Sequence, residues 1–366
     1  MTSLHSRPVT VRPRPELQAL ITSDRTLDPG DTLPAKWYND PGIWQRERWP
    51  IFGSNWVHVA YDHQLRNTGD YVTENLAGWP IFIRRRDDGT LSAFYNLCPH
   101  RAGPLVFEGE GCSKNLVCKY HGWAFNAEGK LLSARDFGAE APDDMDLTAI
   151  QVASWRGMVF VCLNPAIAPL HEWLGQFPNE VDGVPLESYR FHSKSVRHVA
   201  CNWKTYGDNF LEGYHLPTTH PAMSRDADAL NYQVVYKGDP RWNIHTMPPR
   251  DESTFGVFGY FWPTFAFDVF PGGFAVERWL PRGHTHSDLI FEYFFADDAH
   301  GVEDIVKFSE EVADEDARMC EHVQRNLDAG IYDTGDIDAA AAEYVKHHNA
   351  KLGGVLSVPV ARFNQT

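Results

Sequence analysis

The sequence contains few cysteines and no long apolar run, and each shortage excludes a class of protein. Six cysteines among 366 residues are too sparse for a secreted disulfide scaffold. The apolar stretches, such as "MVFVCL" at 158–163, suit buried strands and fall far short of the roughly 18 residues of a membrane span. We therefore expect a cytoplasmic protein with no membrane segment.

Positive charge is also scarce. The chain has 33 Lys and Arg against 49 Asp and Glu, which gives a formal net charge of −16. A nucleic-acid surface needs patches of Lys and Arg, and none stands out. No G-x-G-x-x-G motif follows a strand, and a plant-type C-x4-C-x2-C set is missing. We therefore expect neither nucleic acid nor a dinucleotide as a ligand of this chain.

Residues 48–165 read as short β-segments separated by turns such as "RDDGT" and "NAEGK", which predicts an all-β domain. Residues 166–366 predict an α+β domain, with a helical stretch at about 203–216, apolar strands between 259 and 296, and a long helix at about 302–329. Residues 1–47 predict an extended arm and then a helix after Pro41, packed against one domain or the other.

Two cysteines and two histidines in the first domain share an unusual spacing. Cys98, His100, Cys118 and His121 form C-x-H-x17-C-x-x-H, so each loop supplies one thiolate and one imidazole. A C2H2 zinc finger instead groups its cysteines on one arm and its histidines on the other. The mixed loops favour a [2Fe-2S] centre with two cysteines on one iron and two histidines on the other. A zinc site or four unrelated buried residues remain the alternatives.

A second group of candidate ligands lies in "NWKTYGDNFLEGYHLPTTHP", residues 202–221. We expect Glu212 and His215 on one helix face, and we expect Pro217 to end that helix so that His220 returns from a loop. Two histidines five residues apart, with Asp208 and Glu212 before them, are typical of a metal site.

The carboxylate for this site is expected from the helix at about 302–329. Asp316 falls inside an apolar stripe, where an unpaired carboxylate would be costly without a partner or metal. Glu315 is the second candidate, and Asp314 points to the polar face. The stripe consists of Ile305, Phe308, Val312, Met319, Val323 and Leu327. The two histidines and Asp316 would make a 2-His-1-carboxylate triad for non-haem Fe(II), with positions left open for oxygen and substrate.

The "CPHR" and "CKYHGW" loops resemble those of a Rieske iron–sulfur domain, and residues 45 to 330 resemble the catalytic (alpha) subunit of Rieske non-haem iron oxygenases. "DNFLEGYHLPTTHPAMSRDAD" and "EDARMCEHVQRN" resemble the branch of choline, betaine and carnitine monooxygenases. The resemblance implies a helix-grip catalytic domain with an antiparallel sheet after the Rieske domain. It also implies a homotrimer, and a separate reductase that carries NADH and flavin, with or without a ferredoxin.

The resemblance further implies a bridging carboxylate between the cluster of one subunit and the iron of its neighbour. Many ring-hydroxylating relatives carry aspartate three residues before the first iron-ligating histidine, whereas this chain has Glu212. Glutamate also occurs in the carnitine branch, so the bridging role is carried over to Glu212, with Asp208 as the weaker rival.

The expected activity is hydroxylation of a small organic substrate with O2 and NADH-derived electrons. Branch resemblance favours monooxygenation or N-demethylation of a betaine-like quaternary ammonium compound over oxidation of an aromatic acid. A Rieske electron carrier and a zinc-stabilised binding protein remain as other classes. Aromatic residues of the later strands could line the substrate pocket or fill the core. They are Phe258, Tyr260, Trp262, Phe265, Phe267 and Trp279.

Overall fold

A computed structural model describes residues 32–137, 144–223, 231–246, 257–332 and 346. The expected extended arm at the N-terminus lies outside the described residues. The chain divides into two compact units, one containing Phe52–Leu174 and the other containing Gly175 onward together with the described residues up to Ile51. No helix of the described part is long and apolar enough to cross a membrane.

The first unit is built on an antiparallel seven-stranded sheet in the order β1-β10-β9-β4-β3-β2-β5, as expected for an all-β domain. Both predicted hairpin turns form, and each places a glycine at positive φ, Gly89 at 78° and Gly129 at 81°. The large sheet consists of β1 (Val57–Tyr61), β2 (Asp70–Leu76), β3 (Trp79–Arg85), β4 (Leu91–Tyr95), β5 (Glu110–Cys112), β9 (Ala149–Trp155) and β10 (Met158–Cys162). The remaining elements are the small sheet of β6 (Leu116–Val117), β7 (Ala124–Phe125) and β8 (Leu131–Ser133), the 3-10 turn Asp62–Gln64 and α3 (Leu170–Leu174).

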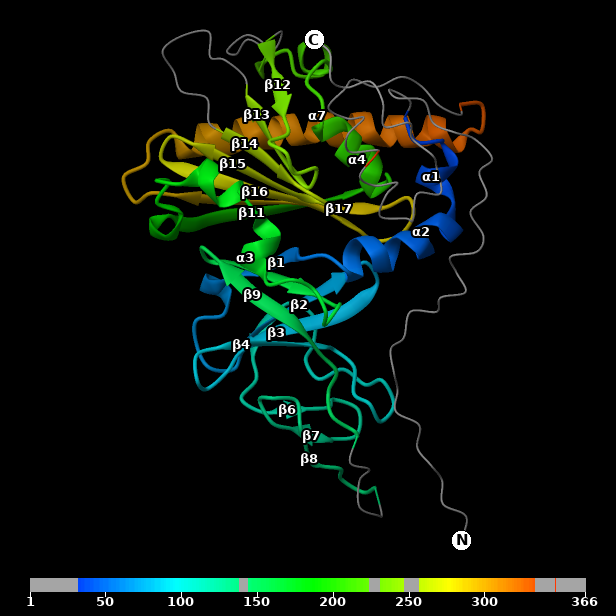
Figure 1. Ribbon diagram of the computed structural model, residues 1–366, viewed down its shortest axis with the longest axis vertical. Coiled ribbons are helices and arrows are strands. Elements are labelled where there is room, and N and C mark those ends of the chain that lie inside the picture. Colours follow the sequence, from blue (N-terminus) through cyan, green and yellow to red (C-terminus); the bar gives the residue numbers. More distant parts are fainter. Residues whose placement is uncertain (1–31, 138–143, 224–230, 247–256, 333–345, 347–366) are drawn as a thin grey trace. The chain divides into compact units, whose positions relative to one another are not determined.

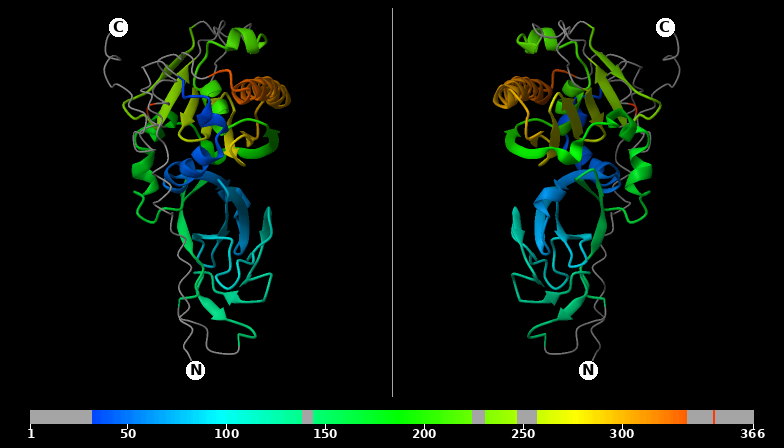
Figure 2. Two further views of the ribbon diagram at one scale, coloured as in Figure 1. Left: turned by 90° about the vertical axis from the view of Figure 1, so that its right-hand side faces the viewer. Right: turned by 90° about the vertical axis from the view of Figure 1, so that its left-hand side faces the viewer.

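The second unit is a seven-stranded antiparallel sheet in the order β11-β17-β16-β15-β14-β13-β12, with α7 lying along one face (Figures 1 and 2). This is the α+β domain that the sequence predicts. The strands are β11 (Arg190–Val199), β12 (Gln233–Val235), β13 (Trp242–Thr246), β14 (Val257–Phe261), β15 (Phe265–Phe270), β16 (Gly273–Pro281) and β17 (Ser287–Phe295). The helices are α1 (Lys36–Asn39), α2 (Pro41–Glu47), α4 (Trp203–Phe210), α5 (Leu216–Thr219) and α7 (Val302–Asp328), with shorter turns at Phe177–Val181 and Leu186–Ser188. A π-helical segment at Arg48–Gly53 contains the residues where the chain passes from this unit to the first.

The helix expected after Pro41 is α2, and it belongs to the second unit. Asp40 caps it by accepting hydrogen bonds from the backbone N–H groups of Gly42 (2.6 Å) and Ile43 (3.3 Å). At its other end, Glu47 and Lys204 form an ion pair of 2.8 Å in which both side chains are fully buried. A buried lysine needs such a partner, so this pair fastens α2 to α4.

The single helix expected at 203–216 is wrong, because α4 ends at Phe210 and α5 begins only after His215. Pro217 lies in the first turn of α5, where its missing N–H leaves no bond unmade, so it starts a helix instead of ending one. A helix continuing through Pro217 would also place the proline ring against the carbonyl of Gly213. Glu212 therefore lies in the segment between α4 and α5, and His215 and His220 flank the four-residue α5.

The helix α7 matches the expected long helix, but the predicted apolar stripe is partly wrong. Met319 and Val323 are exposed, at 44% and 40% of their surface, whereas Asp316 is buried as expected. The buried face contains small and polar residues that a hydrophobicity pattern overlooks. It comprises Ala313, Asp316, Cys320, Gln324 and Leu327.

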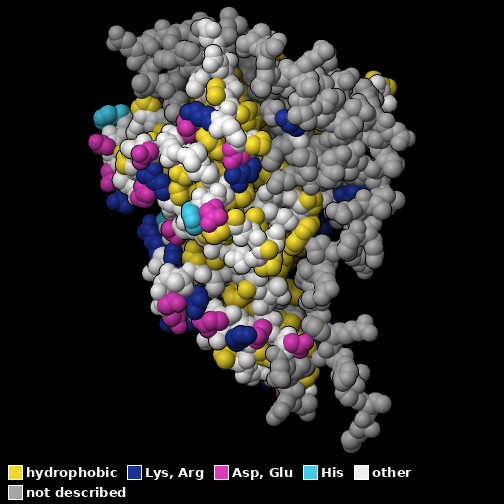
Figure 3. Space-filling view, in the orientation of Figure 1, with side chains coloured by type: hydrophobic (Ala, Val, Ile, Leu, Met, Phe, Trp, Pro, Cys, Tyr) yellow, Lys and Arg dark blue, Asp and Glu magenta, His cyan; other side chains and the backbone are white. Residues whose placement is uncertain are grey.

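The surface of the described residues carries charged groups of both signs (Figure 3). On the face drawn in Figure 3, acidic and basic side chains of the described residues are interspersed with apolar ones. Small charged groups of both signs are typical of a solvated surface.

Candidate active site

The cysteine and histidine quartet comes together at two loops of the first unit, one after β4 and one after β6. Cys98 and Cys118 are buried, at 1% and 3% exposure, and their thiols interact directly. Burial, together with the neighbouring Cys118, raises the pKa of the Cys98 thiol. The rings of His100 and His121 lie with centroids 4.7 Å apart. The structure thus places the two sulfurs together and the two imidazoles together.

The surroundings of the quartet fit a bound [2Fe-2S] cluster. Nδ1 of His100 is buried and has no hydrogen-bond partner among the described residues, as expected of a nitrogen that would bind iron. A Cβ at Gly103 would lie 2.9 Å from the Cys118 sulfur and 2.7 Å from Tyr120, so only glycine leaves this space open. The Trp123 ring stacks on the His100 ring with centroids 4.5 Å apart.

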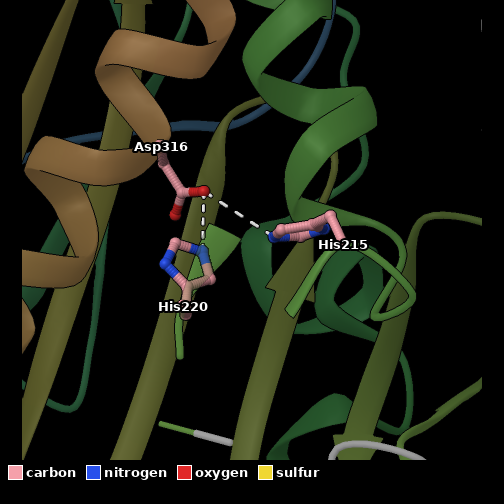
Figure 4. Close-up of side chains that lie close together, drawn as sticks. All are labelled: His215, His220 and Asp316. Atoms are coloured by element: carbon pink, nitrogen blue, oxygen red, sulfur yellow. Dashed lines mark hydrogen bonds and ion pairs between the residues drawn. The ribbon is translucent and has the colours of Figure 1, made fainter. Parts of the chain in front are cut away.

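The second group of predicted ligands comes together in the second unit. His215 precedes α5, His220 follows it, and Asp316 points toward both from α7 (Figure 4). The Nε2 atoms of His220 and His215 lie 2.9 Å and 3.7 Å from Oδ1 of Asp316. One ligand atom from each residue lies within 4.8 Å of the others, a spacing that suits a single metal ion.

Each of these histidines has a carboxylate on its second ring nitrogen. Nδ1 of His215 contacts Glu212, which also accepts the backbone N–H of His215 at 3.2 Å. Nδ1 of His220 lies 2.7 Å from Glu315. Such carboxylates orient metal-binding imidazoles and fix the tautomer that presents Nε2 to the metal.

The neighbours of Asp316 on α7 do not join this cluster. Glu315, the second candidate ligand, contacts the outer nitrogen of His220. Asp314 is exposed and pairs with Arg197 at 2.6 Å, in agreement with its expected place on the polar face. Asn209, which sequence patterns did not single out, donates a hydrogen bond of 2.8 Å to Oδ1 of Asp316.

Asp208 and Glu212, the two candidates for the bridging carboxylate, differ in their partners. Glu212 is 7% exposed and directs both carboxylate oxygens to His215. Asp208 accepts a hydrogen bond of 2.5 Å from Tyr38. Burial raises the pKa of Asp208 to about 7, although the Tyr38 hydrogen bond and the charge of Lys204 both lower it. The described residues show no hydrogen bond between Asp208 and either histidine.

The triad opens into a cavity of about 610 Å³ between the sheet and α7. Of the six aromatic residues that the sequence suggested for a pocket, Phe258 lines this cavity. The other five are buried in the core, so for them the packing alternative holds. The aromatic lining that the sequence did not identify comprises Tyr206, Phe210, Tyr232, Phe270, Phe291 and Phe308.

The charged residues that line the cavity are acidic. Its described lining includes no Lys or Arg, and its carboxylates are Glu212, Asp268, Glu277, Asp304 and Asp316. Burial, with Asp268 nearby, raises the pKa of Glu277 well above its ordinary value, and Tyr206 donates a hydrogen bond to this group. His245 remains neutral because burial lowers its pKa to about 3. Asp268 in β15 and Glu277 in β16 were not identified from the sequence, because each is the single acid of a strand in which most residues are apolar.

Comparisons with known proteins agree with both clusters. Residues 55–151 match the family model of the Rieske [2Fe-2S] domain, and residues 186–354 match that of the ring hydroxylating alpha subunit (catalytic domain). The chain is 28% identical to the chloroplastic choline monooxygenase of Atriplex hortensis, covering 93% of this chain and 82% of that protein. It is 29% identical to the carnitine monooxygenase oxygenase subunit of Escherichia coli K12, covering 82% and 85%.

A solved structure with the same architecture is that of the quaternary ammonium Rieske monooxygenase CntA in complex with L-carnitine. It aligns with a TM-score of 0.77 and 25% identity, over 88% of this chain and 95% of that chain. The fold agrees with the resemblance to Rieske oxygenases that the sequence motifs indicate. Both family matches and the relatives that cover most of the chain agree with it as well. The chain belongs to the Rieske non-haem iron oxygenases and consists of a Rieske [2Fe-2S] domain followed by the catalytic domain of a ring-hydroxylating alpha subunit.

Proposed function

We propose that this oxygenase hydroxylates a methylammonium compound, by monooxygenation or N-demethylation, in the cytoplasm. The observation that carries the proposal is the lining of the cavity at the triad, whose described residues include five carboxyl groups, with Glu277 protonated, and no Lys or Arg. A cation is stabilised in such a cavity, whereas the carboxylate of an aromatic acid would be buried without a positive partner. Choline and carnitine monooxygenases among the relatives support the same substrate class.

The proposed ligands of the cluster are Cys98 and Cys118 on one iron and His100 and His121 on the other. The adjacent sulfurs, the adjacent imidazoles and the buried Nδ1 of His100 support this division. When bound, the cluster supplies electrons one at a time at a potential raised by its neutral imidazole ligands. A separate reductase carrying flavin and NADH, with or without a ferredoxin, would deliver them.

The proposed ligands of the mononuclear Fe(II) are His215, His220 and Asp316. Bound iron with three protein ligands leaves positions for O2 and substrate and supplies the oxygen chemistry. The protein contributes orientation, since Glu212 and Glu315 each hold one imidazole by Nδ1 and leave Nε2 directed at the metal. Asn209 holds the carboxylate of Asp316 in the same way.

Glu212 is also the proposed bridge for electrons between subunits of a homotrimer. Its carboxylate is already fixed on His215, and across a subunit contact it could accept a hydrogen bond from His121 of a neighbour. One CntA structure is described in terms of inter-subunit electron transfer, which supports such an assembly. Asp208 is the weaker candidate because Tyr38 bonds one of its oxygens and the described residues show no hydrogen bond from Asp208 to either histidine.

The test is substrate-dependent oxygen uptake and NADH consumption with a generic reductase. Choline, L-carnitine and γ-butyrobetaine are compared with benzoate and toluate, because half of this chain is 36% identical to a toluate 1,2-dioxygenase alpha subunit. We expect coupled turnover with at least one quaternary ammonium compound. Oxygen uptake with the aromatic acids alone would refute the proposed substrate class.

A further inference from the structure

Five neighbouring strands of the catalytic sheet place one residue each in a row across the face that lines the cavity. The ladder pairs His245 with Phe258, Phe258 with Asp268, Asp268 with Ala275, and Ala275 with Tyr293. Directly opposed residues of antiparallel strands point to the same face, so these side chains are neighbours. His245, Phe258, Asp268 and Ala275 all line the cavity. Asp268 therefore brings a carboxylate into an otherwise uncharged row.

Asp268 lacks a partner that would explain its position. Its Oδ1 is buried and has no hydrogen-bond partner among the described residues. The neighbours on either side, Phe258 and Ala275, have no side-chain donor. Burial without a partner raises the pKa of Asp268 to about 7. A carboxylate of this kind is stabilised when a cation enters the space in front of it.

Most of the other carboxylates of the cavity are already engaged. Glu212 is held on His215, Tyr206 donates to Glu277, and Asp316 accepts from Asn209. Asp304 is exposed in the first turn of α7. Among the described lining residues, Asp268 is thus the carboxylate that combines an oxygen buried from solvent with the lack of a hydrogen-bond donor for that oxygen, which leaves it available to a ligand.

The row also provides space and an aromatic surface beside Asp268. Ala275 has a single methyl group, so the cavity is open next to the carboxylate. On the opposite side Phe258 offers a ring on which a methylated ammonium group can stack by a cation–π contact. Glu277 is the diagonal neighbour of Asp268 across the ladder, and Asp268, Glu277 and Asp316 all line the cavity. Burial raises the pKa of Glu277, and the charges of Asp268 and Asp316 both raise it further.

We infer that Asp268 is the specificity-determining residue that binds the positive charge of the substrate, with the Phe258 ring beside it. The assignment rests on the proposed function and names the residue that selects its substrate class. A substrate anchored at Asp268 extends past Glu277 with its reactive carbon toward His215, His220 and Asp316.

The test measures equilibrium binding by calorimetry to the full-length, metal-loaded protein under anaerobic conditions. The probes are choline, γ-butyrobetaine and the uncharged analogue of choline in which carbon replaces nitrogen. We expect Asp268→Asn to weaken binding of the cations by about 100-fold and leave the uncharged analogue unchanged, because a buried charge loses its partner only in the first case. The matched control Asp298→Asn removes the same charge from an exposed position and should bind all probes like the wild type.

A second variant keeps the inference testable if Asp268→Asn does not fold. Phe258→Leu retains an apolar side chain and should weaken binding of the cations more than binding of the uncharged analogue. Unchanged choline and γ-butyrobetaine affinity in Asp268→Asn, or an equal loss for choline and its analogue, would overturn the inference. Continued turnover of quaternary ammonium compounds by that variant would leave the proposed function standing. Wild-type protein that binds benzoate and no cation would overturn both.

Discussion

Three consecutive carboxylates of α7 have three different surroundings, and truncating them one at a time tests the proposed iron site. Asp314 is exposed and pairs with Arg197. Glu315 contacts the outer nitrogen of His220, at 2.7 Å. Asp316 is 8% exposed and lies within 4 Å of both imidazole Nε2 atoms. Because all three residues lie in α7, differences in iron content among the variants reflect the different side-chain partners and not a general effect on the helix.

The expected effects are graded. Wild-type protein should hold about three irons per chain, two in the cluster and one at the triad. Asp316→Ala should hold about two irons and lose oxygenation while keeping the Rieske spectrum, because its metal lies in a different unit from the cluster. Glu315→Gln should keep the third iron but bind it about 10- to 100-fold more weakly. Asp314→Ala removes a surface ion pair, so it should retain all the iron and lose about 1 kcal/mol of stability or less.

The assays are iron and sulfide analysis of anaerobically reconstituted protein, an Fe(II) titration of the cluster-loaded protein, and urea unfolding. His220→Ala serves as a positive control, since it removes a proposed ligand from outside α7. Loss of the third iron in Asp314→Ala, together with its retention in Asp316→Ala, would refute the assignment of Asp316 as the ligand. Loss of the third iron in Glu315→Gln as complete as in Asp316→Ala would instead make Glu315 a ligand.

Three other results are expected. Glu212→Gln should keep both metal centres loaded but slow the reoxidation of a pre-reduced cluster in a single turnover by orders of magnitude, and a wild-type rate would remove its bridging role. Affinity for choline should rise from pH 6 through pH 7 and level off at about pH 8, because Asp268, whose pKa is about 7, must lose its proton to bind a cation, whereas His245 stays neutral and Glu277 stays protonated over this range; calorimetry across this range should show no such rise in Asp268→Asn. Lys204→Met should lower the free energy of unfolding by about 3–5 kcal/mol in urea titrations, because it leaves a buried glutamate without its partner, and a loss below about 1 kcal/mol, as for an exposed pair, would contradict this.

The parts of the site that the sequence predicted are those whose geometry is local. Cys98 and His100 share one short loop, and Cys118 and His121 share another, so the spacing alone indicates a shared metal centre. Asp316 is buried, as its place in the helix predicted, although the buried face runs through Cys320 and Gln324 instead of the expected Met319. Helical periodicity fixes which residues share a face, but hydrophobicity alone does not show which face is buried.

The parts that the sequence could not predict depend on distant neighbours. Gly213 faces Tyr232, whose nearest ring atom would lie 2.0 Å from an added Cβ, and nothing near Gly213 in the sequence indicates this contact. Asp268 reaches the cavity because the sheet register sets it between Phe258 and Ala275. Register follows from pairing with other strands, so a single acid in an apolar strand cannot be assigned to a pocket before the sheet is known.

Polar contacts along α7 hold the triad in position independently of any metal. Asp316 accepts a hydrogen bond from Asn209 of α4, and further along the helix Gln324 accepts the backbone N–H of Asn202 at 2.9 Å. Gln324 also donates to the carbonyl of Tyr38 at 3.4 Å, which ties α1 to the same helix. These buried bonds fix the position of α7 against the segment that carries His215, and buried polar networks with every member bonded are rigid. The ligand Asp316 and the orienting Glu315 are adjacent on α7, so a shift of this helix would displace a ligand and the partner of His220 together. Iron affinity should therefore depend on the packing of α1, α4 and α7 as well as on the three ligands.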